Sequence, residues 1–199
     1  MAKRMMLVLS IGTLLVVLAG GVALAKTFTG TGGNDNIEGT RNADEISARA
    51  GNDTVDGNNG GDTINGGAGK DDIHGGPGND TTYGLAGVDR LSDSEGDDRV
   101  FGFGGSDEII TSHPGDDQFH GGEGGDYFGG PPCCSYGSIG TDLFDGGDGD
   151  DTIEATDQMG LSPNQPDVVE CGPGTDKVRA DPDDDVAADC EDVRLVRNE

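Results

Sequence analysis

The sequence has no tryptophan, few aromatic residues and few cations. Aromatic residues make up 5% of the 199 residues, and 12 Lys and Arg face 39 Asp and Glu, which gives a formal net charge of -27. Nucleic acids and anionic membranes are themselves polyanions, so this charge argues against both as partners and favours cations. An ordinary core needs more large apolar side chains, and composition alone would suit a disordered acidic chain.

The one long apolar run lies at the N-terminus. Lys3 and Arg4 precede an apolar stretch from Leu7 to Leu18, and Ala23-Leu24-Ala25 follows as a small-x-small cleavage site. This pattern predicts a signal peptide over residues 1–25, which makes the mature chain secreted, extracellular and without a membrane span. The alternative is an uncleaved anchor helix, because the apolar run is nearly long enough to cross a bilayer.

Cysteines are also scarce, at positions 133, 134, 171 and 190. In an exported chain an even number of cysteines favours disulfides, and four cysteines permit three pairings. A bond between Cys171 and Cys190 would close a loop of about 20 residues and contribute roughly 3 kcal/mol. Cys133 and Cys134 are adjacent, and they form either a vicinal disulfide or partner-binding loop or part of a tolerated surface insertion.

What the chain does have is a nine-residue period. From Gly30 onward the sequence divides into blocks with Asp at the sixth position and, in nearly every block, an apolar residue at the eighth. A disordered acidic chain would show neither regularity. One extra residue, Thr111, and two interruptions at residues 130–136 and 155–161 break the array. The sixth-position residues are Asp35, Asp44, Asp53, Asp62, Asp71, Asp80, Asp89, Asp98, Asp107, Asp117, Asp126, Asp142, Asp151, Asp167, Asp176 and Asp185.

These blocks resemble the haemolysin-type, or RTX, nonapeptide G-G-x-G-x-D-x-U-x, in which U is apolar. The best matches are GGAGKDDIH, GGPGNDTTY, GGEGGDYFG and GGDGDDTIE, and the resemblance covers residues 30–188. It implies an all-β fold, a parallel β-roll (a β-helix solenoid) with two nonapeptides in each coil. The expected layout is a roll over residues 26–188 and a C-terminal cap over residues 189–199, where Val193, Leu195 and Val196 would cover the open end.

The resemblance also implies that the turns bind several calcium ions. Calcium takes six to eight oxygen ligands, and a glycine-rich turn can offer backbone carbonyls beside the Asp carboxylate. Each ion would lie between repeats i and i+2, and without calcium the stacked carboxylates would repel, so calcium would drive folding. We expect weak or absent sites at Asp167 and Asp185, where Gln165 and Asp183 replace the fourth-position glycine. The remaining fourteen sixth-position Asp residues are the candidate ligands.

Other functions are less well supported by the residues. His74, His113 and His120 form no H-E-x-x-H pair and no serine lies in G-x-S-x-G, so we do not expect an enzyme. An EF-hand over residues 181–192 lacks the turn glycine and the final Glu. A toxin role would rest on analogy alone, since typical RTX proteins lack an N-terminal signal peptide. An adhesive or matrix spacer with a cell-surface partner stays open, because it is compatible with calcium binding.

Overall fold

The structure is a computed structural model that describes residues 25–111, 113–130, 140–156 and 165–196. The predicted signal peptide lies outside the described residues, apart from Ala25, and so does the Cys133–Cys134 pair. In the described part of the chain no helix is long and apolar enough to cross a membrane.

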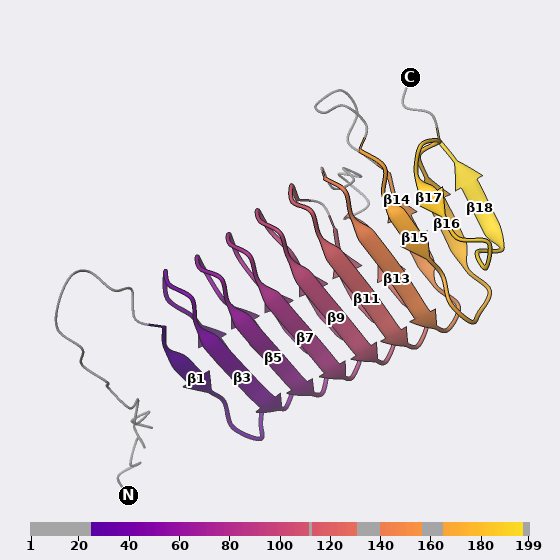
Figure 1. The fold of residues 1–199 in the computed structure, drawn as a ribbon. Helices are drawn as coiled ribbons and strands as arrows, with labels where there is room; N and C mark the ends of the chain where they lie inside the picture. Colours follow the sequence, from indigo (N-terminus) through magenta and orange to yellow (C-terminus); the bar gives the residue numbers. More distant parts are fainter. Residues whose placement is uncertain (1–24, 112, 131–139, 157–164, 197–199) are drawn as a thin grey trace, which may run out of the picture.

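The described chain forms two nine-stranded sheets in which every neighbouring pair of strands is parallel. Odd-numbered strands make one sheet and even-numbered strands make the other, so consecutive strands alternate between the sheets and the chain winds as a solenoid (Figure 1). This confirms the predicted all-β parallel β-roll.

We call the two layers the odd sheet and the even sheet. The odd sheet contains β1 (Thr27–Thr29), β3 (Glu45–Ala50), β5 (Thr63–Ala68), β7 (Thr81–Ala86), β9 (Arg99–Gly104), β11 (Gln118–Glu123), β13 (Leu143–Asp148), β15 (Val168–Glu170) and β17 (Asp185–Val186). The even sheet contains β2 (Asn36–Glu38), β4 (Thr54–Asp56), β6 (Asp72–His74), β8 (Arg90–Ser92), β10 (Glu108–Ile110), β12 (Tyr127–Phe128), β14 (Thr152–Ala155), β16 (Lys177–Ala180) and β18 (Asp192–Leu195).

The register shows that one coil consists of two nonapeptides. Ile46 of β3 lies beside Ile64 of β5, and Val55 of β4 lies beside Ile73 of β6. The spacing of 18 residues becomes 19 between β9 and β11, where the extra residue enters, and 25 across the longer interruption between β11 and β13. The strands on either side of each insertion therefore keep their partners.

Two predicted boundaries need correction. Ala155, assigned to the second interruption, is a buried residue of β14 and pairs with Ala180 of β16. In the last coil Val168 pairs with Asp185, so the residue equivalent to a sixth-position Asp is Asp184, one residue earlier than the sequence period indicates. Asp167 and Asp184, which occupy equivalent places in successive coils, are therefore 17 residues apart instead of 18.

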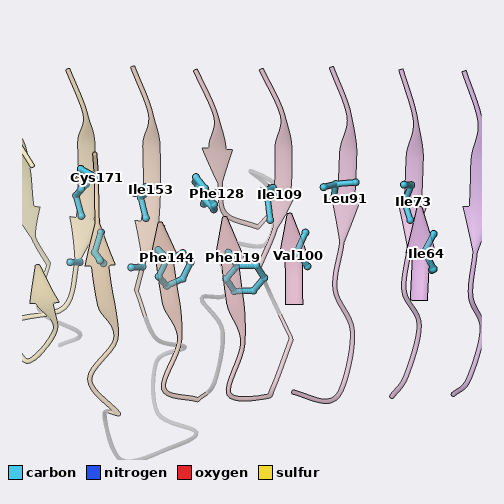
Figure 2. Packing of buried hydrophobic residues seen from close by; sticks show 14 of the residues in the cluster. Ile64, Ile73, Leu91, Val100, Ile109, Phe119, Phe128, Phe144, Ile153 and Cys171 are labelled. Atoms are coloured by element: carbon cyan, nitrogen blue, oxygen red, sulfur yellow. The ribbon is translucent and has the colours of Figure 1, made fainter. Parts of the chain in front are cut away.

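The eighth-position residues fill the interior as two columns, one from each sheet (Figure 2). Alternation along a strand directs these side chains inward, and every coil therefore adds one residue to each column. In the later coils phenylalanine replaces the aliphatic residues, and the rings of Phe119 and Phe144 stack with centroids 5.3 Å apart. The columns are Ile46, Ile64, Thr82, Val100, Phe119, Phe144 and Val169, and Val55, Ile73, Leu91, Ile109, Phe128, Ile153 and Val178.

A covalent bond ties the last coils together at the C-terminal end. Cys171 and Cys190 form a disulfide with their Cα atoms 5.3 Å apart, as predicted for this pair. β18 adds a last strand to the even sheet, and Val193 lies in register with Val178 at the end of the interior column. Leu195 remains 57% exposed, so the tail covers the open end of the roll only in part.

Candidate metal-binding turns

Every turn of the roll ends in an acidic residue that directly precedes a strand, and these residues form two rows along the solenoid. The first row precedes the even sheet and consists of Asp35, Asp53, Asp71, Asp89, Asp107, Asp126, Asp151 and Asp176, and it ends at Glu191 before β18. The second row precedes the odd sheet and consists of Asp44, Asp62, Asp80, Asp98, Asp117, Asp142, Asp167 and Asp184. Most of these carboxylates are buried, although a buried carboxylate is stable only when a partner compensates its charge.

Within each row, the backbone links every carboxylate to the next coil. The amide N–H of Asp53 donates to Oδ1 of Asp71 at 2.8 Å, and the amide of Asp71 donates to Oδ1 of Asp89 at 2.8 Å. The pattern continues to the C-terminal end, where the amide of Asp167 donates to Asp184 at 3.1 Å and that of Asp176 donates to Glu191 Oε2 at 3.0 Å. The carboxylates of successive coils are therefore aligned along the axis, as the predicted pairing of repeats i and i+2 requires.

Sequence reasoning missed both terminal members of these rows. Asp184 stands in a run of three aspartates, and only the register of β15 with β17 shows which of them enters the row. Asp185, the sixth-position residue of the sequence period, is exposed. Glu191 precedes β18 as the aspartates precede other strands, and this position before a final strand was the available signal.

The glycines of the turn make room for the carboxylates and for the neighbouring coil. A Cβ at the first-position residue Gly75 would lie 2.7 Å from Oδ2 of Asp80, closer than atoms pack. At the fourth position, Gly78 has φ of +144°, and an added Cβ would overlap the carbonyl oxygen of Gly60 in the preceding coil. Backbone of one turn thus packs directly on backbone of the next, which only glycine allows.

The second carboxylate oxygen, Oδ2, accepts no hydrogen bond from the described residues in most turns. This holds for Asp53, Asp62, Asp71, Asp80, Asp89, Asp107, Asp117, Asp126, Asp151 and Asp176, whose Oδ2 atoms are buried. A buried oxygen without a partner costs about 1–3 kcal/mol, and more when it is charged. These oxygens are therefore the atoms of the turns that most need a cation.

Three turns differ, because their own backbone supplies a partner. The amide of Thr31 donates to Oδ2 of Asp35 at 2.6 Å, and the amide of Thr40 donates to Oδ2 of Asp44 at 2.5 Å. A longer bond of 3.3 Å joins the amide of Ser94 to Oδ2 of Asp98. We call these three the self-capped turns.

The backbone conformation of the second residue separates the two kinds of turn. In turns with an unpartnered Oδ2, the second residue is left-handed, whether it is Gly67 with φ of +114° or Leu85 with φ of +81°. Arg49, Asn58 and Phe103 also adopt positive φ at this position. Thr31, Thr40 and Ser94 of the self-capped turns are not among the residues with positive φ. The turn of Asp117 contains an extra residue, and Ser112 in that turn lies outside the described residues.

Burial raises the pKa of many of these carboxyls. The pKa of Asp80 rises to about 7, that of Asp126 to about 7 and that of Asp117 to about 8, first because the groups are desolvated and further because neighbouring aspartates repel a second charge. Such shifts mark carboxylates that lack a compensating positive charge, and a bound cation would supply it.

The donors fit a hard cation that uses backbone oxygen as well as side chains. Among the described residues, no group of three or more His, Cys, Asp and Glu side chains is arranged to hold a metal ion. An ion in these turns would thus take carboxylate oxygens from two coils and complete its shell with turn carbonyls. All of these are oxygen donors, which suit calcium.

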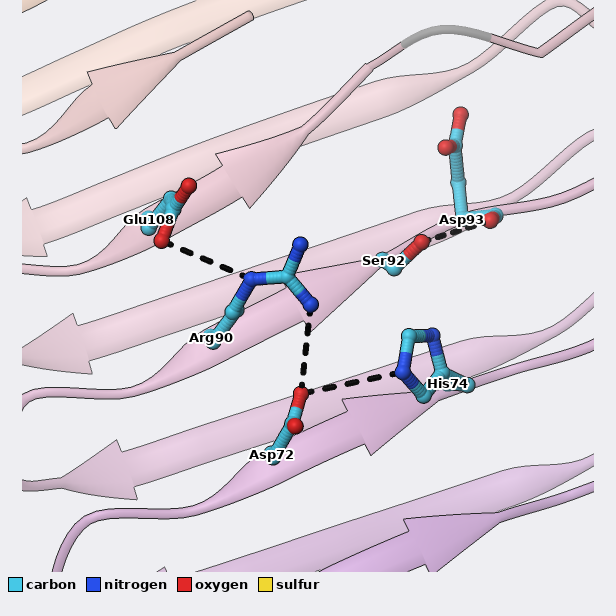
Figure 3. Close-up of polar contacts among 6 residues, drawn as sticks. All are labelled: Asp72, His74, Arg90, Ser92, Asp93 and Glu108. Atoms are coloured by element: carbon cyan, nitrogen blue, oxygen red, sulfur yellow. Dashed lines mark hydrogen bonds and ion pairs between the residues drawn. The ribbon is translucent and has the colours of Figure 1, made fainter. Parts of the chain in front are cut away.

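Histidines and cations outside the rows make surface contacts. Arg90 contacts Asp72 and Glu108, each at 3.5 Å, and His74 lies 3.7 Å from Asp72 (Figure 3). His120 Nδ1 lies 3.1 Å from Asp145 Oδ2, and its ring stacks on Phe101 with centroids 4.8 Å apart. These residues lie on the outer face of the strands, away from the two rows.

A parallel roll in which glycine-rich turns end in buried aspartates defines the class of calcium-binding β-roll repeats. The family model of the RTX calcium-binding nonapeptide repeat matches residues 29–64, 50–82, 83–112, 109–128 and 136–157, which is more than half of the chain. The chain belongs to this family and is a calcium-binding repeat protein. Its repeat is a structural unit rather than a typically catalytic one. A search of curated proteins finds no match.

Proposed function

We propose that the chain is an exported protein whose roll binds several calcium ions, each between adjacent coils on one side of the roll. Each ion takes carboxylate oxygen from the aspartates of repeats i and i+2, together with turn carbonyls. The observation that carries this proposal is the series of buried Oδ2 atoms without a hydrogen-bond partner among the described residues. The hydrogen bonds from each Asp amide to Oδ1 of the Asp in the next coil hold these atoms one coil apart.

We expect the calcium affinity of a site to depend on whether its turns are self-capped. From Asp53 to Asp176 the first row has an unpartnered Oδ2 in every coil, so each neighbouring pair there is a full candidate site. In the second row Asp62 and Asp80 form such a pair, whereas Asp44 and Asp98 are self-capped. Asp35 is self-capped at the start of the first row. We propose weaker sites at these three positions, and Asp142 remains a candidate by its place in the second row.

Calcium would act on folding because it reverses the sign of the interaction between coils. Strands in a sheet are about 4.8 Å apart. Two carboxylates at that distance repel by roughly 1 kcal/mol in water and by about 3 kcal/mol at an effective dielectric of 20. Repeated over both rows, this repulsion is comparable with the ~5–15 kcal/mol that stabilises an ordinary domain. We therefore propose that calcium completes folding rather than binding to a roll that is already stable.

A calcium titration of the metal-free protein tests this function. We expect isothermal titration calorimetry to show several ions bound per chain, and far-UV circular dichroism to show β structure increasing cooperatively over the same range. Magnesium at the same concentration is the control, because it prefers strict octahedral geometry and retains its waters. Absence of calcium binding would overturn the function, whereas an unchanged β spectrum in excess chelator would overturn only the coupling to folding.

Export rests on the charged, apolar and small-residue order of residues 1–25. The Cys171–Cys190 disulfide supports it, because such bonds persist in oxidising compartments. N-terminal sequencing of protein recovered from the culture medium should begin at Lys26. Recovery of the full-length chain from the membrane fraction would favour the anchor alternative.

A second candidate function is a calcium-stabilised adhesive or matrix spacer. The observation that favours it is a row of aromatic rings on the outer face of the odd sheet, where Tyr83 stacks on Phe101 at 5.3 Å and Phe103 is 47% exposed nearby. Exposed aromatic side chains are enriched at interaction surfaces. Retention of the purified protein on producer cells in calcium, reduced in Phe103→Ala and unchanged in the exposed control Val88→Ala, would support this role. Equal retention of all three would count against it.

A further inference from the structure

Asp93 occupies a position where the repeat pattern calls for glycine. It is the first residue of the block DSEGDDRVF, the position that Gly75 and Gly84 occupy in GGPGNDTTY and GLAGVDRLS. Its side chain is fully buried, and Oδ1 lies 3.0 Å from Nδ1 of His113. Oδ2 is also buried and accepts no hydrogen bond from the described residues. A fully buried carboxylate with one unpartnered oxygen is costly, so its presence at a glycine position calls for a ligand.

A second unpartnered oxygen belongs to the next coil. The amide of Asp93 donates to the carbonyl of Ile110 at 3.4 Å, so Thr111, the next residue, takes the corresponding first position one coil further on. The extra residue of this coil therefore follows Thr111, which corrects the predicted place of the insertion. Thr111 is 1% exposed, and its Oγ1 likewise has no hydrogen-bond partner among the described residues.

The carboxylate that closes the Thr111 turn is Asp117, and its Oδ2 is unpartnered as well. The negative charge of Asp93 contributes to the raised pKa of Asp117, which indicates that the two carboxyls lie within electrostatic reach of each other. In the coil of Asp93 itself, the sixth-position residue Asp98 is self-capped by Ser94. In this coil the Asp98 carboxylate already accepts a hydrogen bond at Oδ2, whereas Asp93 provides an additional carboxylate with an unpartnered oxygen.

Figure 3 shows the Asp93 carboxylate directed away from the surface contacts of Asp72, Arg90 and Glu108. Ser92 does not cap it, because its hydroxyl donates to the backbone carbonyl of Asp93 at 3.1 Å. Among the described residues, the only bond to the carboxylate that the geometry shows is the one from His113 to Oδ1.

We propose that Asp93 Oδ2, Thr111 Oγ1 and Asp117 Oδ2 are ligands of one further calcium ion, at a site that the nonapeptide pattern does not define. His113 is a positioning residue that holds Oδ1 and leaves Oδ2 free for the ion. The donors are oxygens, two of them charged, as calcium prefers. This inference rests on the proposed calcium binding of the roll, and it assigns a ligand role to Asp93 and Thr111, which lie outside the sixth positions.

The test measures calcium binding to the metal-free full-length chain by isothermal titration calorimetry with calcium alone. Asp93→Gly restores the glycine of the repeat, so the roll should fold, and Asp93→Asn keeps the shape without the charge. We expect both variants to bind one ion fewer than the wild type, or to bind one ion at least about tenfold more weakly. The exposed neighbour Asp97→Asn is the matched control and should bind as the wild type does.

The variant His113→Gln distinguishes a role of Asp93 as a calcium ligand from a role only in an ion pair with His113. If Asp93 served only to pair with His113, then His113→Gln and Asp93→Gly would reduce calcium binding equally, and the ligand role would be overturned. Unchanged stoichiometry and affinity in Asp93→Gly would overturn it too. A wild-type chain that binds no calcium would instead contradict the proposed function as a whole, so the two failures are distinguishable.

Discussion

The residue at the second position of each turn differs in backbone conformation between turns that are otherwise alike. Where it is left-handed, as at Asn58, the sixth-position Oδ2 has no partner among the described residues, and where it is not, as at Thr40, its amide caps that oxygen. An oxygen that already accepts a hydrogen bond gains less from an ion than one that accepts none. The second residue thus influences the calcium affinity of a turn that contains the expected Asp.

This difference predicts unequal effects of the same substitution in one row. Asp62→Asn should remove at least one calcium ion from the binding stoichiometry, because its Oδ2 is unpartnered. Asp44→Asn should reduce calcium binding less, because Thr40 already caps that carboxylate and the site there is weaker. Equilibrium dialysis with calcium would measure both variants. Equal losses in the two would show that self-capping does not weaken a site.

The fourth-position glycine gives a second prediction at the same scale. Gly78→Ala places a Cβ against the carbonyl of Gly60 at positive φ, and it should cost about 2 kcal/mol or more, lowering the melting temperature by roughly 4 °C or more in calcium. Gly33 is the matched control, because it holds the same repeat position in the first turn, where an added Cβ meets nothing within 4 Å. A similar melting temperature for Gly78→Ala and Gly33→Ala would contradict the close stacking of turns.

The sequence was sufficient to locate the aspartates of the rows up to Asp176, because a fixed offset repeated along the chain is visible without coordinates. Self-capping was not predictable, since Leu85 and Phe103 adopt positive φ although their residue types disfavour it. Stacking on the adjacent coils imposes that conformation, and no local pattern records it.

At the scale of the strands, each element contributes one eighth-position side chain to a column, so column residues carry most of the packing. Phe119→Ala should destabilise the calcium-loaded roll by about 3–5 kcal/mol, because Phe119 is fully buried and stacks on Phe144. The expected fall in melting temperature is about 6 °C or more. Phe103→Ala, which truncates an exposed ring outside the columns, should change stability by no more than about 0.5 kcal/mol.

Chemical denaturation in saturating calcium measures both variants. If Phe103→Ala proved as destabilising as Phe119→Ala, the division between interior columns and outer face would be wrong.

The strands were predicted in kind but not in length or final register. The strands begin at the seventh residue of nearly every block, and those of the odd sheet from β3 to β13 continue for three residues into the next turn. The final shift to Asp184 arises because the last full coil is one residue short and a run of aspartates hides the change. A period read along the chain cannot resolve such a shift, whereas hydrogen bonding between β15 and β17 fixes it.

At the scale of the whole molecule, the two rows of carboxylates make stability depend on pH. Burial raises the pKa of Asp62 to about 6, of Asp80 to about 7 and of Asp117 to about 8 in the metal-free fold. A folded pKa above the unfolded one stabilises the fold while the carboxyl is protonated. This contribution is fully present below the ordinary pKa of 3.8 and is lost as the pH rises through about 6–8.

Metal-free protein should therefore contain more β structure at about pH 5 than at about pH 9. Calcium binding should show the opposite trend, because protons compete for the same oxygens and the affinity should fall as the pH falls. Far-UV circular dichroism in chelator and calcium titrations across this pH range would measure the two trends. A metal-free roll that gains stability as the pH rises would contradict the pKa directions.

The coil of 18 residues also makes the length of this protein adjustable in whole units. Each Asp amide donates to the coil that follows, and each Oδ1 accepts from the coil that precedes, so every interior coil presents the same two faces to its neighbours. An in-frame duplication or loss of one coil would bring together faces that already match, and the disulfide-bonded end would remain as it is. Chain length, and with it the number of ions carried, is thus a property that gene rearrangement can alter stepwise without a new fold.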